Sequence, residues 1–162
     1  MPYVILTVAL VGLDQLVKYL VLQNIAPGAH VPFIPHILEL TYVENTGAAF
    51  SMFEEHTWIL AVISLVMSLV LAAALWKNFF RHPLGKVTLT LLLAGAVGNL
   101  IDRVFRGYVV DMFNVLFMNF AVFNVADICV VVGGIAAAVY YLFLMDKLEP
   151  KEKPHDDHNA HR

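Results

Sequence analysis

The sequence has few charged residues and almost no cysteine. Charged side chains make up 14% of the 162 residues, whereas soluble domains carry about 25%. Cysteine occurs once, at Cys129 within an apolar run, which argues against a disulfide framework and against a cysteine-based metal site. We interpret Cys129 as a small core residue. The composition therefore excludes an ordinary soluble domain and a disulfide-stabilised scaffold.

The usual hydrolytic motifs are also absent. None of the three serines lies in a Gly-x-Ser-x-Gly motif. No His-Glu-x-x-His motif occurs, and the histidines before the C-terminal segment are scattered. His155, His158 and His161 recur every three residues in a polar segment that we interpret as a solvated tail rather than a metal site. We expect no metal and no cofactor.

Hydrophobic residues make up 60% of the chain and are concentrated in four segments. A helix of about 20 apolar residues crosses a bilayer. The sequence therefore predicts an all-α membrane protein with four transmembrane helices, at about residues 2–22, 57–76, 87–105 and 125–145. We expect a single membrane domain over residues 1–146 and a polar cytoplasmic tail over residues 147–162. The first segment lacks the basic start and small-residue cleavage site of a secretory signal, so we expect it to be retained.

Lysine and arginine predict the orientation of the helices. Basic residues occur in the 77–86 loop and in the tail, and none occurs between Lys18 and Lys77. The positive-inside rule then places both termini and the 77–86 loop in the cytoplasm. The segments 23–56 and 106–124 are expected on the outer side.

The outer segment 23–56 contains two runs rich in β-branched and aromatic residues, at 30–34 and 37–43. Proline and glycine between them indicate short strands and turns. We expect a small strand-containing extracytoplasmic cap. The 106–124 loop has a similar character, and its aromatic residues suit a bilayer interface.

Two aspartates border the last outer loop. Asp127 follows Asn124 at the start of the fourth helix, where Asn124 can cap the helix and the helix dipole favours an anion. Asp111 lies among apolar residues with no adjacent cation. Ionisable groups at membrane depth usually face the bundle interior and serve a function. If the two carboxylates lie close together, they share a proton and can hydrolyse an amide.

Two further polar groups lie within the helices. Asp14 and Lys18 are four residues apart and can form an ion pair, or one of them can reach a polar site, since Lys18 is near enough to the helix end to extend outward. Asn99, Asp102 and Arg103 share one helix face. Asp102 and Arg103 could brace each other, or Asn99 and Arg103 could orient a carboxylate or bind a substrate carbonyl.

From these residues alone, three functions remain open. The first is an aspartic peptidase. The second is a small proton-coupled membrane transporter, which uses membrane acids as proton carriers but favours an internal repeat that the sequence lacks. The third is a membrane scaffold in which the polar residues only join helices.

The motifs resemble those of the bacterial lipoprotein signal peptidase family (signal peptidase II). The matching blocks occur in the family's order: DQLVK at 14–18, ENTGAAF at 44–50, GNLIDR at 98–103, GYVVD at 107–111 and FNVAD at 123–127. Together they extend over most of the chain.

The resemblance implies an intramembrane aspartic endopeptidase of the bacterial cytoplasmic (inner) membrane, sensitive to globomycin. Its catalytic pair would be Asp111 and Asp127, near the outer face. Its partners would be membrane lipid and diacylglyceryl-modified prolipoproteins, cleaved just before the lipidated lipobox cysteine. We expect a monomer that binds no nucleic acid. The residues expected to support the site or bind substrate are Asp14, Lys18, Asn45, Gly47, Asn99, Arg103, Asn124 and Ala126.

Overall fold

The computed structural model describes residues 1–47 and 57–149. Three of its long helices are α1 (Pro2–Asn24), α2 (Thr57–Trp76) and α3 (Pro83–Phe105). The fourth is α4 (Val125–Val139), which continues through the π-helical turn η2 (Tyr140–Leu144) into α5 (Met145–Leu148). Within these ranges four helices are long and apolar enough to cross a membrane. The prediction of four spanning helices is confirmed.

Helix α3 begins earlier than the sequence predicted. The expected start was residue 87, but the helix starts at Pro83. A proline suits the first helical turn because its missing N–H would have no partner there. The His82 side chain also caps the helix by accepting a hydrogen bond from Leu84 N at 3.2 Å. This local capping extends the helix beyond its apolar stretch.

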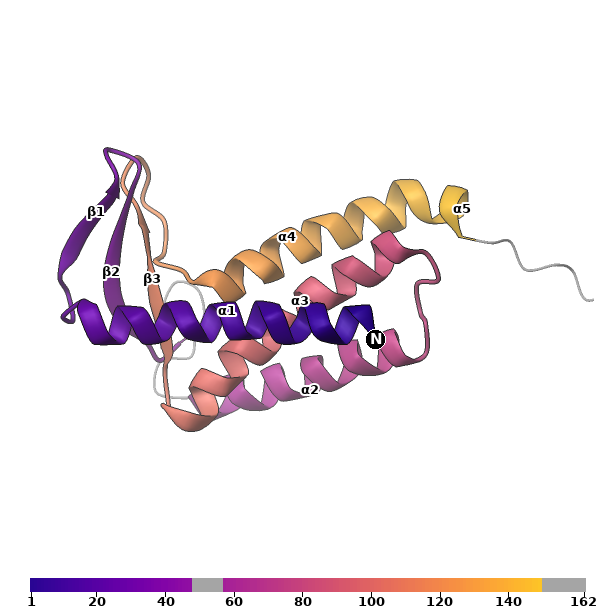
Figure 1. Cartoon of the computed structure of the whole chain (residues 1–162), viewed down its shortest axis with the longest axis horizontal. Coiled ribbons are helices and arrows are strands. Elements are labelled where there is room, and N and C mark those ends of the chain that lie inside the picture. The colour runs from indigo at the N-terminus through magenta and orange to yellow at the C-terminus, as the bar shows by residue number, and fades with distance from the viewer. Residues whose placement is uncertain (48–56, 150–162) are drawn as a thin grey trace, which may run out of the picture.

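A three-stranded antiparallel sheet covers one end of the helical bundle (Figure 1). Its strands are β1 (His30–Ile34), β2 (Leu38–Asn45) and β3 (Val109–Val115), in that order across the sheet. The predicted strand-containing cap is therefore confirmed. The sheet also extends beyond the 23–56 segment, because β3 comes from the 106–124 loop and pairs Asp111 with Val43 of β2.

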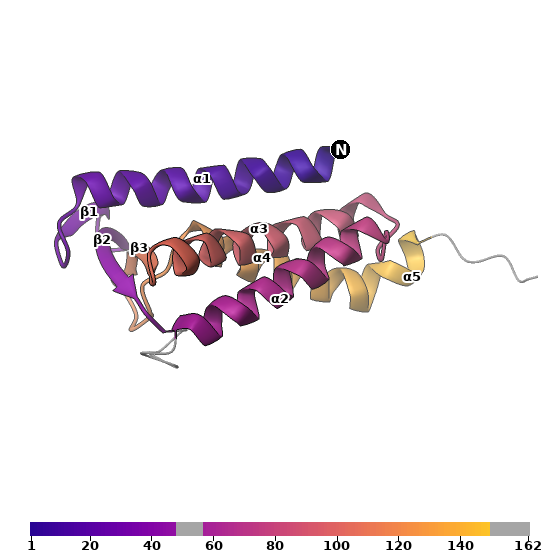
Figure 2. The same ribbon diagram turned by 90° about the horizontal axis from the view of Figure 1, so that it is seen from below.

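The opposite end of the bundle holds the N-terminus, the turn between α2 and α3, and α5 (Figures 1 and 2). There the ring of Phe80 packs edge-on against Tyr140 with centroids 4.9 Å apart. Glu149 connects the end of α5 to the α2–α3 turn and to η2. Its carboxylate accepts hydrogen bonds from Arg81 N at 2.7 Å, His82 N at 3.0 Å and Tyr140 Oη at 2.7 Å. Residues 150–162, which include the predicted histidine-containing tail, lie outside the described residues.

Helix α3 is the centre of the bundle and packs against α1, α2 and α4. In the most apolar 18-residue stretch of α3, 44% of the residues are buried, against 17% in the corresponding stretch of each of the other three spanning helices. The outer faces of those three helices carry exposed aliphatic side chains, which are compatible with lipid rather than water. Gly98 of α3 lets the helices approach closely: a Cβ there would lie 2.7 Å from Asp14 Oδ2 and 3.1 Å from Ala126 Cβ.

Candidate active site

Asp111 lies on β3, at the junction of the sheet and the helices. Its side chain is almost completely buried. The carboxylate accepts a hydrogen bond from Asn45 Nδ2 at 2.8 Å and one from Asn124 Nδ2 at 2.6 Å. Gly47 N donates to Asn45 Oδ1 at 3.0 Å, which orients the Asn45 amide so that its nitrogen faces Asp111. The predicted residues Asn45 and Gly47 therefore lie beside Asp111.

Asp127 lies in the first turn of α4. Asn124 is the N-cap, and the two residues form a capping box in which Asn124 Oδ1 accepts from Asp127 N at 2.9 Å. The Asp127 carboxylate accepts in return from Asn124 N at 3.1 Å, and also from Asn99 Nδ2 at 2.8 Å. The predicted helix cap is confirmed. Because Asn99 also holds Asp127, this carboxylate does more than cap its own helix.

Asn124 connects the two aspartates. Its side-chain nitrogen donates to Asp111, and its backbone nitrogen donates to Asp127. Two carboxylates bound by one residue lie in the same small site. Burial, together with the negative charge of Asp127, raises the pKa of Asp111 to about 6, although the hydrogen bonds from Asn45 and Asn124 oppose the shift. A carboxyl group with this pKa exchanges its proton near neutral pH.

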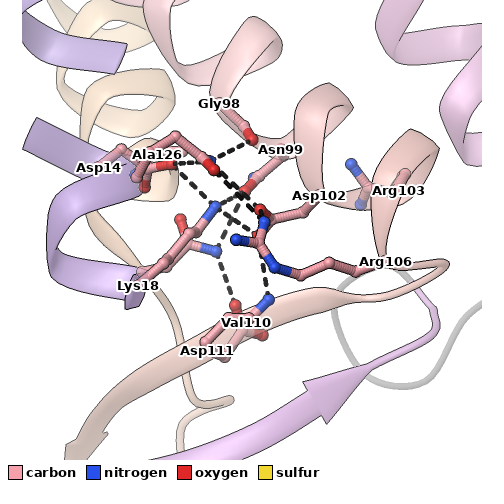
Figure 3. A network of polar contacts seen from close by, with 12 residues as sticks. Asp14, Lys18, Gly98, Asn99, Asp102, Arg103, Arg106, Val110, Asp111 and Ala126 are labelled. Carbon is pink, nitrogen blue, oxygen red and sulfur yellow. Dashed lines mark hydrogen bonds and ion pairs between the residues drawn. The ribbon is translucent and has the colours of Figure 1, made fainter. Parts of the chain in front are cut away.

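Lys18 lies at the centre of the polar network behind the aspartates (Figure 3). Its Nζ atom is 2.9 Å from Asp14 Oδ2, 2.9 Å from Asp102 Oδ2 and 2.9 Å from Asn99 Oδ1. Lys18 is completely buried, so the expectation that it could extend outward is wrong. Its ammonium group is instead held in the interior by the carboxylates of Asp14 and Asp102, which offset part of the cost of burying its charge.

Asp14 links the first and fourth helices. It forms the predicted ion pair with Lys18, and its other oxygen accepts a hydrogen bond from Ala126 N at 2.8 Å. Ala126 is buried at the start of α4, one residue before Asp127. Both alternatives considered for Asp14 and Lys18 hold, because the ion pair also reaches the polar site.

Asp102 was not among the residues expected to support the site or bind substrate, but it belongs to the same network. It is fully buried and accepts hydrogen bonds from Val110 N at 3.1 Å and Gln15 Nε2 at 3.2 Å. It also pairs with Lys18 and with Arg106, one turn further along α3. The possible brace between Asp102 and Arg103 is present as an interaction between their charges, but Asp102 forms its ion pair with Arg106, because residues four apart meet on the helix surface. That spacing of Asp102 and Arg106 was the signal in the sequence.

Arg103 instead faces the aspartates and α2. Its Nη1 atom donates to Ser64 Oγ at 3.2 Å, and its charge interacts with both Asp127 and Asp111. Its Nε atom is buried and, among the described residues, has no hydrogen-bond partner. Buried polar atoms normally have partners, so an open donor beside two carboxylates marks a place where a ligand can bind.

Four helices long and apolar enough to cross a membrane, with a buried Asp111 and a half-buried Asp127 at one end, define a multi-pass membrane protein with a candidate acid–base site. The family model described as "Signal peptidase (SPase) II" matches residues 6–143. The chain therefore belongs to the signal peptidase II family, and its function is that of a lipoprotein signal peptidase. The resemblance seen in the sequence motifs is confirmed.

Curated relatives named lipoprotein signal peptidase match along nearly the whole chain. That of Enterococcus faecalis is 46% identical, over 93% of this chain and 92% of its own length. That of Clostridioides difficile is 40% identical, over 91% of this chain and 99% of its own length. A bacterial membrane enzyme solved by the in meso method at 2.3 Å has a TM-score of 0.84 and 30% identity, with 94% of each chain covered. These likenesses extend over sheet and helices alike.

Proposed function

We propose that the chain is an intramembrane aspartic endopeptidase in which Asp111 and Asp127 are the catalytic residues. The observation that carries this proposal is the position of Asn124, which donates a hydrogen bond to each carboxylate. Neither aspartate pairs directly with a lysine or arginine among the described residues, in contrast to Asp14 and Asp102. Carboxylates without a fixed counter-ion keep lone pairs available for water and substrate.

The reaction needs one proton shared by the two aspartates. The ionised carboxylate accepts a proton from water while the oxygen of that water attacks the scissile carbonyl carbon. The protonated carboxyl group donates to the carbonyl oxygen, which gives a neutral tetrahedral diol. The C–N bond then breaks: the leaving amine takes a proton from the carboxyl group that was protonated by water, and the diol gives one hydroxyl proton to the other carboxylate as it becomes the new C-terminal carboxyl group. The pair thus regains its one shared proton when the products depart. The pKa of about 6 for Asp111 suits this exchange.

The surrounding residues divide into those that hold the aspartates and one that faces the substrate. Asn45, Asn99 and Asn124 donate to the two carboxylates. Lys18 orients Asn99, because an ammonium group can only donate and therefore binds the Asn99 oxygen, which turns the Asn99 nitrogen to Asp127. Arg103 has the open donor, and we assign it to a substrate backbone carbonyl.

The substrate is a prolipoprotein whose lipobox cysteine carries diacylglycerol, and the cut falls just before that cysteine. Relatives named lipoprotein signal peptidase support the substrate class, and the sequence resemblance supports the lipid requirement. The position of the site also supports it. Asp111 and Asp127 lie where the sheet meets the helices, so a peptide at the membrane surface can reach them while its lipid chains stay in the bilayer.

The test compares two forms of one precursor with the purified protein in lipid. The diacylglyceryl-modified precursor should be cleaved directly before the modified cysteine, as shown by the product masses, and the unmodified precursor should remain intact. Chelators and serine-directed reagents should not slow the reaction, because both catalytic groups are carboxylates. Equal cleavage of the two precursors would contradict the substrate assignment, and inhibition by a chelator would contradict the aspartic mechanism.

The topology belongs to the same proposal: both termini are cytoplasmic, and the aspartates lie near the outer face of the membrane. The N-terminus, the basic α2–α3 turn and α5 share one end of the bundle, which supports this orientation (Figure 1). Membrane-impermeant thiol reagents on intact cells should label a cysteine placed at Phe33 of β1 but not one placed at Asn78. The reverse labelling would overturn the orientation. We also propose a monomer, which light scattering in detergent can test.

A further inference from the structure

We propose that Asp102 is a positioning residue for Asp111: its carboxylate binds the backbone of β3 at Val110 and thereby sets where the Asp111 side chain lies. The inference rests on the proposed catalytic role of Asp111. It assigns to a buried carboxylate on α3 a role in the reaction that does not involve contact with the substrate (Figure 3).

The contact lies on the edge of β3 that faces away from β2, where Phe113 forms a single bridge with Phe123. In the order β1-β2-β3, strand β3 has only β2 as a neighbouring strand, and alternate N–H groups of an edge strand point away from that neighbour. Val110 N donates instead to Asp102 Oδ2 at 3.1 Å, and Val110 is completely buried. Val110 immediately precedes Asp111, so this hydrogen bond fixes the backbone one residue from the proposed catalytic carboxylate.

The other partners of Asp102 exclude a direct catalytic role. A carboxylate offers about four lone-pair positions. Asp102 accepts from Val110 N, Lys18 Nζ, Gln15 Nε2 and Arg106 Nη1, and it has no exposed surface. No position is left for water or a substrate carbonyl. Asp111 and Asp127, with two side-chain or backbone donors each, keep that capacity.

The charges explain how such a carboxylate is kept beside the aspartate pair. Lys18 and Arg106 carry two positive charges, and Asp14 and Asp102 carry two negative charges, so the group is balanced within itself. Arg103 lies outside this balanced group, and its charge acts on Asp111 and Asp127 together with that of Lys18. Asp102 therefore holds β3 without adding a net charge to the site.

Three variants test the positioning role. Asp102→Asn keeps the size of the side chain but leaves one acceptor oxygen for donors that now occupy two, so the Val110 contact is lost or must compete with the Arg106 and Gln15 contacts. Asp102→Glu keeps the charge and the acceptors but moves them by one methylene group. Arg106→Gln removes a partner of the opposite carboxylate oxygen and leaves the Val110 contact in place. Purified variants are compared for kcat, KM and pH profile on diacylglyceryl-modified prolipoprotein.

A displacement of catalytic groups by about 1 Å can lower a rate by about a hundredfold. We expect Asp102→Asn to lower kcat by about tenfold to a hundredfold with little change in KM, and to shift the acid limb of the pH profile because the surroundings of Asp111 change. Asp102→Glu should recover part of the loss. Arg106→Gln should have a much smaller effect on kcat than Asp102→Asn, with an unshifted pH profile.

Unchanged kcat in both Asp102 variants would overturn the positioning role. An equal fall in kcat in Arg106→Gln and Asp102→Asn would also overturn it, because Asp102 would then act only as a member of the ion-pair network. If Asp102→Asn does not fold, Asp102→Glu, with its charges still balanced, decides between these outcomes. The proposed function fails separately: it is overturned if Asp111→Asn is active, whatever the Asp102 variants do.

Discussion

The two ends of the bundle are built from different interactions. At the sheet end, charged and amide side chains from α1, α3, β3 and α4 are buried or half-buried and hydrogen-bonded to one another. At the opposite end, Phe80 and Tyr140 pack with aliphatic residues, and the Glu149 carboxylate meets Arg81 N at an exposed position. Burying charge is costly even when it is paired, whereas apolar packing is favourable.

The difference indicates which end carries function. A bundle stabilised only for folding could use apolar contacts at both ends, since replacing buried ion pairs by packed apolar groups is often neutral or stabilising. The costly network is confined to the end that contains Asp111 and Asp127. The predictions below compare substitutions at the two ends, from the largest expected effect to the smallest.

Lys18→Met should destabilise the protein most. It leaves the carboxylates of Asp14 and Asp102 buried without their shared cation. Removing one partner of a buried ion pair costs about 3–5 kcal/mol. The measurement is the free energy of unfolding in detergent. The control is Lys86→Met at the opposite end, where Lys86 donates to Asn78 at an exposed position. Similar losses in the two variants would remove the contrast between the ends.

Asn124→Ala should have the next largest effect, on catalysis. It removes a hydrogen-bond donor to Asp111 and the side-chain cap of α4. Hydrogen bonds to charged groups contribute about 1.5–3 kcal/mol, so kcat/KM should fall by about tenfold to a hundredfold. The control is Asn24→Ala, where the amide only donates to Leu20 O at an exposed helix end. A kcat/KM near that of the unmodified protein would contradict the role of Asn124.

The pH dependence of stability should show the burial of Asp111. Its pKa is about 6 in the folded protein and about 3.9 in the unfolded chain. The folded state therefore holds more protons between these values, so this contribution to stability is complete below pH 4 and is lost as the pH rises through 6. Lowering the pH from 7 to 5 should recover roughly 1 kcal/mol.

The control for this pH effect is Asp111→Asn, which cannot titrate at position 111. Its gain in unfolding free energy between pH 7 and pH 5 should be smaller than that of the unmodified protein by that same amount. Identical gains in both proteins would show that Asp111 is ionised with an ordinary pKa.

Glu149→Gln should have the smallest effect. The Glu149 carboxylate joins α5 to the α2–α3 turn through Arg81 N and His82 N. A glutamine keeps one acceptor oxygen, so we expect a small fall in the unfolding temperature and no change in kcat. Thermal unfolding and cleavage assays on the same sample measure both. A fall in kcat without a fall in unfolding temperature would show that this end influences the active site.

The sequence predicted those features that depend on local patterns. Apolar length predicted four spanning helices, and the Asn124–Asp127 spacing predicted the cap of α4. The strands of the 23–56 segment were also predicted from their β-branched residues. The start of α3 was predicted four residues too late, because Pro83 and the His82 cap extend the helix beyond its apolar residues.

The contacts that build the site could not be predicted, because they join segments far apart in the chain. Lys18 is 81 residues from its partner Asn99, and even Asp102 and Val110, which are eight residues apart, lie on different elements, α3 and β3. Which donors a buried carboxylate accepts depends on how α1, α3 and β3 pack. The four-residue spacings of Asp14 and Lys18 and of Asp102 and Arg106 were the local signals for this group.

The central claim is that Asp111 and Asp127 together carry out the cleavage. The most direct measurement is single-turnover cleavage of diacylglyceryl-modified prolipoprotein by Asp111→Asn and Asp127→Asn, each shown to be folded and inserted in lipid. Asparagine keeps the size of the side chain but cannot hold or transfer the shared proton. We predict no detectable product from either variant. Cleavage by either variant at the rate of the unmodified protein would contradict the account.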